Sequence, residues 1–155
     1  MANKKTTIHE FDPCIYPRLL WVVKGGELGD IKDMFDFDLP DDEERGAVTI
    51  PVRRKVDSRL GYCVWFPKAG DIRNLDWIAH ESSHVALCVF NDVGAIITPE
   101  GQEPFAYLVG WVFGCIDTVR KFKEVKYGSE DSQSANAEKS QLEKACEATQ
   151  EDRNG

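Results

Sequence analysis

One short segment combines residue types that can hold a metal ion and move a proton: His80-Glu81-Ser82-Ser83-His84. Residues four apart in a helix lie one turn above each other on the same face, so His80 and His84 suit two positions of one tetrahedral zinc ion. Glu81 points about 100° away from His80 around the helix axis, beside such a metal rather than on it. The spacing predicts that Glu81 takes a proton from a zinc-bound water while the zinc polarises a substrate carbonyl.

The sequence around this segment predicts a helix over residues 74–90, with Asn74 as the N-cap and residues 91–94 as the stop. The alternative interpretation of the two histidines is ordinary polar surface on an exposed helix. Apolar residues fall on both sides of this helix, however, which predicts that protein encloses it. Buried imidazoles and a buried carboxylate would need a partner for their charge, and a metal ion would supply it.

A catalytic zinc site needs a third protein ligand, and Glu103 lies 19 residues after His84. Glu103-Pro104 predicts the start of a second apolar helix over residues 103–122, because proline is favoured in the first helical turn. Gly110 and Gly114 fall on the Glu103 side of that helix and would allow close approach of the first helix. The alternative for Glu103 is an acidic residue stabilised by the helix dipole, and Glu100 is the second choice of ligand.

Two further side chains come into consideration for chemistry. Tyr107 lies one turn after Glu103, where its hydroxyl would stabilise an oxyanion, although a core tyrosine fits the pattern equally well. His9 precedes the expected fold, so we interpret it as a solvated residue of a loose N-terminus without a role.

The pattern of His80, Glu81 and His84 followed by Glu103 resembles the gluzincin arrangement of zinc metallopeptidases. Residues 103–110 further resemble small uncharacterised bacteriophage and prophage proteins that share this layout. The resemblance covers residues 16–122 and is strongest over residues 80–111. It implies a minimal zincin-like protein in which His80, His84 and Glu103 bind Zn²⁺ and Glu81 is the catalytic base. Well-studied gluzincin peptidases carry a further helical domain that closes the substrate cleft.

The elements that must position these residues predict an α+β fold. β-rich runs at residues 16–23, 47–56 and 60–66 indicate a small antiparallel or mixed sheet packed on the two buried helices. The last two runs are expected to form a hairpin. The strand at residues 60–66 precedes the active helix and would line the cleft and pair with an extended peptide. The acidic residues 27–45 read as a surface excursion, pinned by aromatic residues, that would flank the cleft as a lid.

Composition limits the classes of function. The net charge of −8 would repel phosphate backbones, so nucleic acid is not expected as a partner. The longest nearly unbroken apolar run, residues 104–116, is too short to span a bilayer, and residues 1–7 do not resemble a secretory signal. Five cysteines without a Cys-x-x-Cys pair indicate a reducing compartment, which we interpret as the cytoplasm of a bacterial host if a phage encodes the chain.

The chain length predicts one domain, residues 1–126, followed by a flexible polar tail, residues 127–155. Three functions remain open. The first is a zinc-dependent peptidase or amidase acting on a peptide or protein substrate. The second is a metal-stabilised structural or interaction protein of a phage without catalysis, and the third is a metal-free domain.

Overall fold

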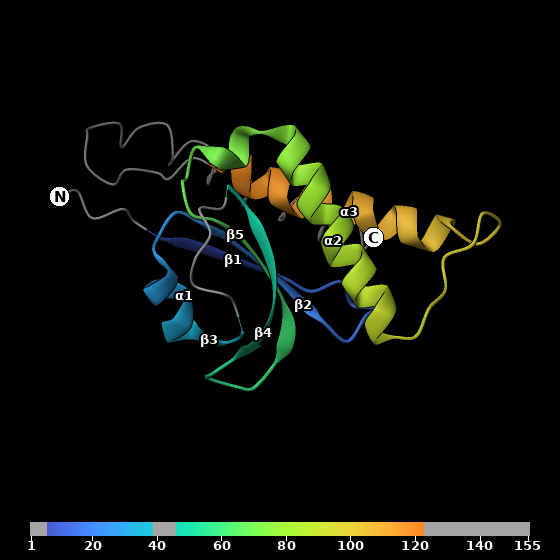
Figure 1. Cartoon of the computed structure of the whole chain (residues 1–155), viewed down its shortest axis with the longest axis horizontal. Coiled ribbons are helices and arrows are strands. Elements are labelled where there is room, and N and C mark those ends of the chain that lie inside the picture. Colours follow the sequence, from blue (N-terminus) through green and yellow to red (C-terminus); the bar gives the residue numbers. More distant parts are fainter. Residues whose placement is uncertain (1–5, 39–45, 123–155) are drawn as a thin grey trace, which may run out of the picture. The chain divides into compact units, whose positions relative to one another are not determined.

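The computed structural model describes residues 6–38 and 46–122, which form an α+β unit (Figure 1). Its elements follow in the order β1 (Thr7–Phe11), β2 (Leu19–Lys24), α1 (Leu28–Met34), β3 (Phe35–Asp36), β4 (Val48–Arg54), β5 (Leu60–Phe66), a 3₁₀ turn (Asp71–Arg73), α2 (Leu75–Asp92) and α3 (Glu103–Lys121). The two long helices confirm the predicted ones almost to the residue. The boundary of the tail predicted at residues 127–155 lies outside the described residues and stays a prediction.

The five strands form one mixed sheet in the order β1-β2-β5-β4-β3. β2 and β5 are parallel, whereas the other neighbours are antiparallel, and β4 with β5 forms the expected hairpin. β5 is therefore the central strand, with β2 on one edge and β4 on the other. The prediction that residues 60–66 pair with a substrate peptide is wrong, because both edges of β5 are already hydrogen-bonded within the sheet.

Protein covers both faces of the sheet. α2 and α3 pack together on one face, above Leu20, Val22, Val64 and Phe66 (Figure 1). α1 covers the other face, where Ile31 and Phe35 contact Trp21 and Cys63 in a second core. A strand buried on both faces reads as a continuous apolar run, which explains why β2 and β5 were found from composition alone.

Three predictions about the first 45 residues need correction. The strand expected at residues 16–23 begins at Leu19. The segment 27–45 is not only a surface excursion, since it contains α1 and β3 and buries Ile31 and Phe35; its residues 39–45 lie outside the described part. His9 belongs to β1 and packs edge-on against the Phe122 ring, with 5.2 Å between ring centroids, so it is not part of a loose terminus.

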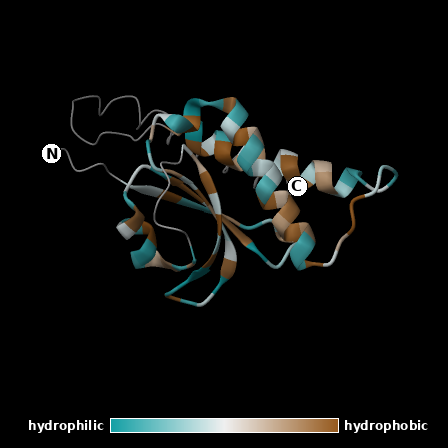
Figure 2. Ribbon diagram, viewed as in Figure 1, coloured by the Kyte–Doolittle hydropathy of each residue, from teal (hydrophilic) through white to brown (hydrophobic). Residues whose placement is uncertain are grey.

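The prediction of two enclosed helices is also wrong in part. Each long helix buries one side, and each exposes the other, where hydrophilic residues are mixed with apolar ones (Figure 2). Trp77 is 37% exposed and Leu87 48% exposed on α2, and Tyr107 is 76% exposed on α3. An apolar residue on a helix surface is common, because folded proteins lack enough polar surface to cover themselves.

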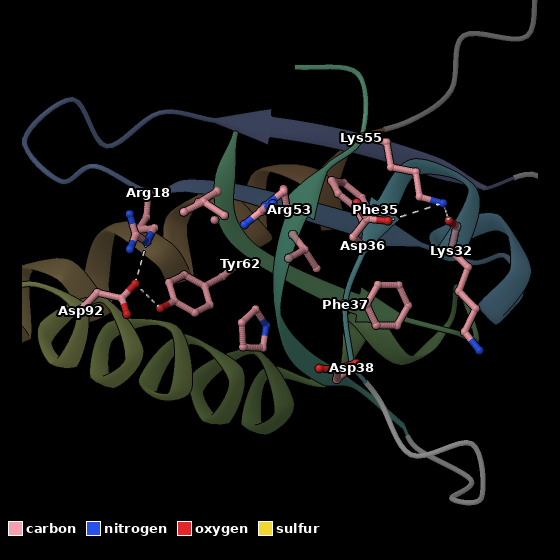
Figure 3. A pocket seen from close by; sticks show the side chains of 14 residues that line it. Arg18, Lys32, Phe35, Asp36, Phe37, Asp38, Arg53, Lys55, Tyr62 and Asp92 are labelled. Carbon is pink, nitrogen blue, oxygen red and sulfur yellow. Dashed lines mark hydrogen bonds and ion pairs between the residues drawn. The ribbon is translucent and has the colours of Figure 1, made fainter. Parts of the chain in front are cut away.

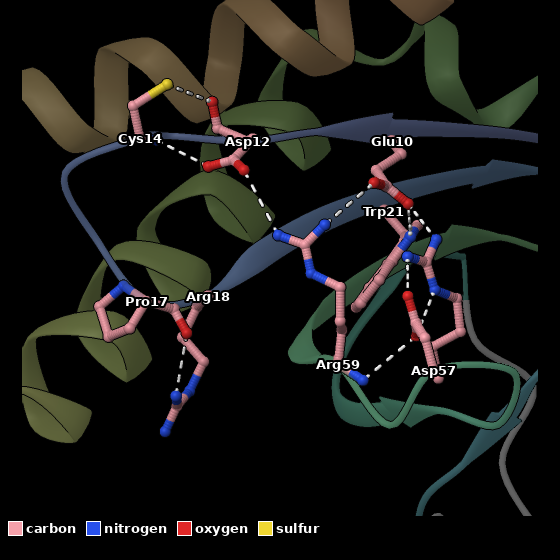
Figure 4. Close-up of polar contacts among 9 residues, drawn as sticks. Glu10, Asp12, Cys14, Pro17, Arg18, Trp21, Asp57 and Arg59 are labelled. Atoms are coloured by element: carbon pink, nitrogen blue, oxygen red, sulfur yellow. Dashed lines mark hydrogen bonds and ion pairs between the residues drawn. The ribbon is translucent and has the colours of Figure 1, made fainter.

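An ion-pair network fastens β1 to the β4–β5 turn (Figure 4). Asp57 accepts hydrogen bonds from Arg54 Nη2 at 2.6 Å and Nε at 2.9 Å, which lowers the pKa of this carboxyl to about 2. Glu10 accepts from Arg54 and, at 2.9 Å, from the Trp21 indole nitrogen. Since Arg54 also lies over the Trp21 ring, 5.3 Å from its centroid, one guanidinium joins three strands.

Within the described residues, neither long helix is apolar enough to cross a membrane.

The contact between β2 and β5 depends on Gly61. A Cβ atom there would lie 2.1 Å from the Leu19 carbonyl oxygen and 2.7 Å from the Trp21 ring. We predict that Gly61→Ala destabilises the fold by about 1–3 kcal/mol, the usual range for overpacking. Thermal unfolding measures the effect. Gly29→Ala is the matched control, because nothing lies within 4 Å of a Cβ at Gly29; equal melting temperatures for the two variants would contradict the account.

Candidate metal centre

Helix α2 carries the candidate metal residues, and local signals fix its start. The Asn74 side chain accepts a hydrogen bond from the Asp76 main-chain N–H at 3.0 Å, as predicted for an N-cap. Ser82 and Ser83, between the two histidines, donate their hydroxyl protons to the carbonyl oxygens one turn earlier. Both serine hydroxyls are thus satisfied inside the helix, which leaves His80, Glu81 and His84 for chemistry.

The two imidazoles converge on one point. The Nε2 atoms of His80 and His84 lie 3.0 Å apart, and the rings stand nearly perpendicular, at 82°, with centroids 4.5 Å apart. Two nitrogens bound to one tetrahedral zinc at 2.0–2.1 Å are separated by about 3.3 Å, so a small adjustment of either side chain opens the pair around the ion. The donor set and spacing of the two histidines therefore fit zinc.

Both histidines are exposed, which corrects the expectation that they are enclosed. The argument that a metal must neutralise their buried charge therefore fails. Their exposure instead leaves the face of α2 that they share open to solvent, as a coordination site with room for water and substrate requires.

Glu81 is the buried member of the segment, only 5% exposed. Its partner is Thr49 on β4, whose hydroxyl donates a hydrogen bond to Glu81 Oε2 at 2.7 Å. The sequence predicted a metal ion as the partner of this buried carboxylate. In the structure its partner is the Thr49 hydroxyl. Sequence spacing gives no sign of Thr49, because only the packing of α2 against β4 brings it to the helix.

A hollow of about 420 Å³ adjoins His80 and Glu81. Its other lining residues come from the start of α2 and the chain entering β4: Gly46, Ala47, Asp76 and Trp77. A Cβ atom at Gly46 would lie 2.1 Å from the Trp77 ring, so glycine is needed for the indole to lie there. Trp77 precedes His80 by three residues, and helical periodicity places both on one side of α2.

Glu103 is the first residue of α3 and is exposed. Across residues 6–38 and 46–122, no three His, Cys, Asp or Glu side chains gather closely enough to hold a metal ion, so the structure does not join Glu103 to the histidine pair. The reason is visible in the helix packing. Phe105 stacks edge-on against Phe90, with centroids 5.5 Å apart, and Phe90 lies six residues beyond His84, about 9 Å along the α2 axis.

Tyr107, Gly110 and Gly114 share the exposed side of α3. Nothing lies within 4 Å of a Cβ atom at either glycine, so the expectation that these glycines admit α2 is wrong. Tyr107 lines an apolar hollow of about 440 Å³ with Pro13, Ile15 and Trp111. At 76% exposure it is not a core tyrosine, and its assignment as an oxyanion donor stays a prediction.

A larger hollow, of about 710 Å³, lies farther along β4, where Pro51 and Arg53 contribute to its wall (Figure 3). At its edge the Asp92 carboxylate accepts hydrogen bonds from Tyr62 Oη at 2.6 Å and from Arg18 Nε at 2.7 Å. Burial and the Asp92 charge raise the pKa of Tyr62. These contacts tie the last residue of α2 to the central strand, so we interpret them as structural.

Searches of protein-family models, of curated proteins and of solved structures each found no match to this chain.

The third metal ligand is open to a direct test. We predict that Glu103→Ala weakens zinc binding by more than the 10- to 100-fold typical of outer-shell changes, because it removes both a ligand and a negative charge. Competition with a calibrated chelator measures the affinity. Glu100→Ala is the matched control, and His80→Ala and His84→Ala set the scale for loss of a ligand. If Glu103→Ala binds zinc like wild type, the third ligand is another residue, and loss in Glu100→Ala would identify it.

Proposed function

We propose that this protein is a zinc-dependent hydrolase, a peptidase or an amidase. His80 and His84 are two zinc ligands and Glu81 is the general base. Glu103 stays the sequence-based prediction for the third ligand, which the described residues do not bring to the histidine pair. The observation that carries the proposal is the convergence of the two Nε2 atoms, 3.0 Å apart, on an open helix face beside the buried Glu81 carboxylate. Zinc, when bound, would polarise the substrate carbonyl and would lower the pKa of a bound water to near neutral pH.

Glu81 then performs the proton transfers. Its carboxylate accepts a proton from the attacking water as the new carbon–oxygen bond forms, and it returns that proton to the departing amine nitrogen. One residue suffices for both steps because the proton leaves and returns on the same side of the carbonyl carbon. A carboxylate fixed by Thr49, rather than rotating in solvent, suits this role, since a general base must lie within hydrogen-bond reach of the proton.

The outer edge of β4 supports a peptide as the substrate. The Arg54 main-chain N–H donates a hydrogen bond to the Arg59 carbonyl, on the β5 side of the strand. Along a strand the main-chain N–H and C=O groups alternate between the two edges, so those of Thr49, Pro51 and Arg53 point away from β5. Proline in the strand agrees, because it has no N–H to give to a neighbour. Among described residues, β3 pairs only with Arg53 and Arg54, which leaves the stretch around Thr49 for an added strand.

A peptide along this edge would run between the two hollows described above. The smaller hollow lies at Ala47, next to His80 and Glu81, and the larger one lies at Pro51 and Arg53. Ala47 at the smaller hollow and Pro51 at the larger one are four residues apart, about 13 Å in a strand, which is the length of four substrate residues. Side chains on both sides of the cleaved bond would therefore have a place to lie.

We predict that the protein purified without a histidine tag carries close to one equivalent of zinc. Two imidazoles and a carboxylate suit zinc better than magnesium or calcium, which prefer sets of oxygen ligands. Elemental analysis by mass spectrometry measures the content. Zinc far below one equivalent, together with no shift of the melting temperature on adding zinc, would contradict the proposal and leave a metal-free domain.

We predict that Glu81→Gln retains zinc but loses about 10²- to 10⁴-fold in hydrolysis, the usual contribution of a general base. The amide oxygen still accepts the Thr49 hydrogen bond, but the amide takes no proton from water. Mass spectrometry of a peptide library incubated with wild type and variant measures the cleavage, with Asp33→Asn, at an exposed residue of α1, as the control. Zinc binding without cleavage by wild type would favour the metal-stabilised phage protein, and an active Glu81→Gln would remove Glu81 as the base.

A further inference from the structure

The structure gives the two oxygens of the Glu81 carboxylate different surroundings. Oε2 accepts the Thr49 hydroxyl proton at 2.7 Å, whereas Oε1 receives no hydrogen bond from the described residues. An ionised carboxylate is an acceptor at both oxygens, so fixing one of them orients the other. The side chain is 5% exposed, and the Thr49 bond is therefore its main polar contact with the protein.

Thr49 itself is held in place from several directions. The side chains of Ile50 and Val52 point into the core beneath α1, so alternation along β4 turns Thr49 toward α2. A β-branched side chain has few χ1 conformations in a strand, which restricts where the hydroxyl lies. That hydroxyl also lies 3.4 Å from the Glu81 main-chain oxygen, so the strand contacts both the side chain and the backbone of one residue.

We infer that Thr49 is the positioning residue of Glu81. Its hydroxyl holds Oε2 so that Oε1 faces the proton of the attacking water, and it does so from the strand that would bind the substrate. The inference rests on the proposed function, because it gives Thr49 a role only in proton transfer by Glu81. A hydrogen bond that merely satisfied a buried carboxylate would affect stability, whereas a positioning bond affects turnover more than substrate binding.

The test compares Thr49→Val, which keeps the shape and removes the hydroxyl, with Thr49→Ser, which keeps the hydroxyl. Thr118→Val is the matched control, since the Thr118 hydroxyl donates to the Gly114 carbonyl of its own helix, away from the candidate site. We predict that all three variants retain zinc in chelator competition. Thr49→Val should lower kcat about 10- to 100-fold with little change in KM, and Thr49→Ser should restore most of kcat.

A second measurement does not depend on turnover. Acetohydroxamic acid chelates zinc and donates a hydrogen bond to a neighbouring carboxylate, so its affinity for the zinc-loaded protein reports the position of Glu81. Calorimetric titration should give weaker binding to Thr49→Val than to wild type, and wild-type binding to Thr49→Ser and Thr118→Val. Thr49→Ala replaces Thr49→Val in both measurements if the valine variant does not fold.

The outcomes separate the two claims. If wild type binds neither zinc nor the hydroxamate, the proposed function fails, and the positioning role fails with it. If wild type binds both, and Thr49→Val matches it in kcat and in hydroxamate affinity, the proposed function stands and the positioning role is overturned. A Thr49→Ser variant as impaired as Thr49→Val overturns the role as well, because the methyl group rather than the hydroxyl would then matter.

Discussion

The hydrogen bond between Thr49 and Glu81 joins helix α2, which carries the candidate site, to strand β4 of the sheet. Glu81 is nearly inaccessible, and a carboxylate in that position would be costly without a donor. Because the donor lies on β4, the rotation of α2 about its axis is set by the sheet: with Glu81 turned toward Thr49, His80 and His84 are turned toward solvent. Glu81 thus faces the sheet and the two imidazoles face solvent, while His80 and Glu81 still line one hollow. The contact of Asp92 with Tyr62 on β5 holds the last residue of the same helix, so α2 is fixed to the sheet near its middle and at its C-terminal end.

Much of the fold was predictable where local signals are strong. Asn74 begins α2, Pro104 lies in the first turn of α3, and the apolar run of β5 gave its boundaries without error. The helix α1 was missed because its seven residues bury only Ile31 and its sequence is rich in aspartate, which is typical of loops. The central position of β5 was also missed. Strand order depends on which distant segments pair, and nothing in the residues of β5 tells that β2 lies on one side and β4 on the other.

The candidate site was predictable to the extent that it lies within one helix. Helical geometry alone places His80 and His84 together, and the structure agrees with a separation of 3.0 Å. Helical geometry does not say which way the helix faces. The apolar residues on both sides of the helix suggested burial, whereas Trp77 and Leu87 are partly exposed in the structure. A residue contributed by another element, such as Thr49, requires knowledge of packing. The same holds for Glu103, whose position follows from the contact of Phe105 with Phe90 rather than from its distance along the sequence.

The geometry of the histidine pair also bears on why a metal would bind there at all. At a separation of 3.0 Å, one neutral imidazole can donate a hydrogen bond to the other. The neutral form is also the form that binds a metal, since each ring must offer a lone pair. The helix has therefore already restricted both side chains to conformations that point at one place, and the loss of conformational freedom on binding is correspondingly small. A bound metal ion would exchange one weak hydrogen bond between neutral rings for two coordinate bonds, and the pair faces solvent, where an ion could reach it.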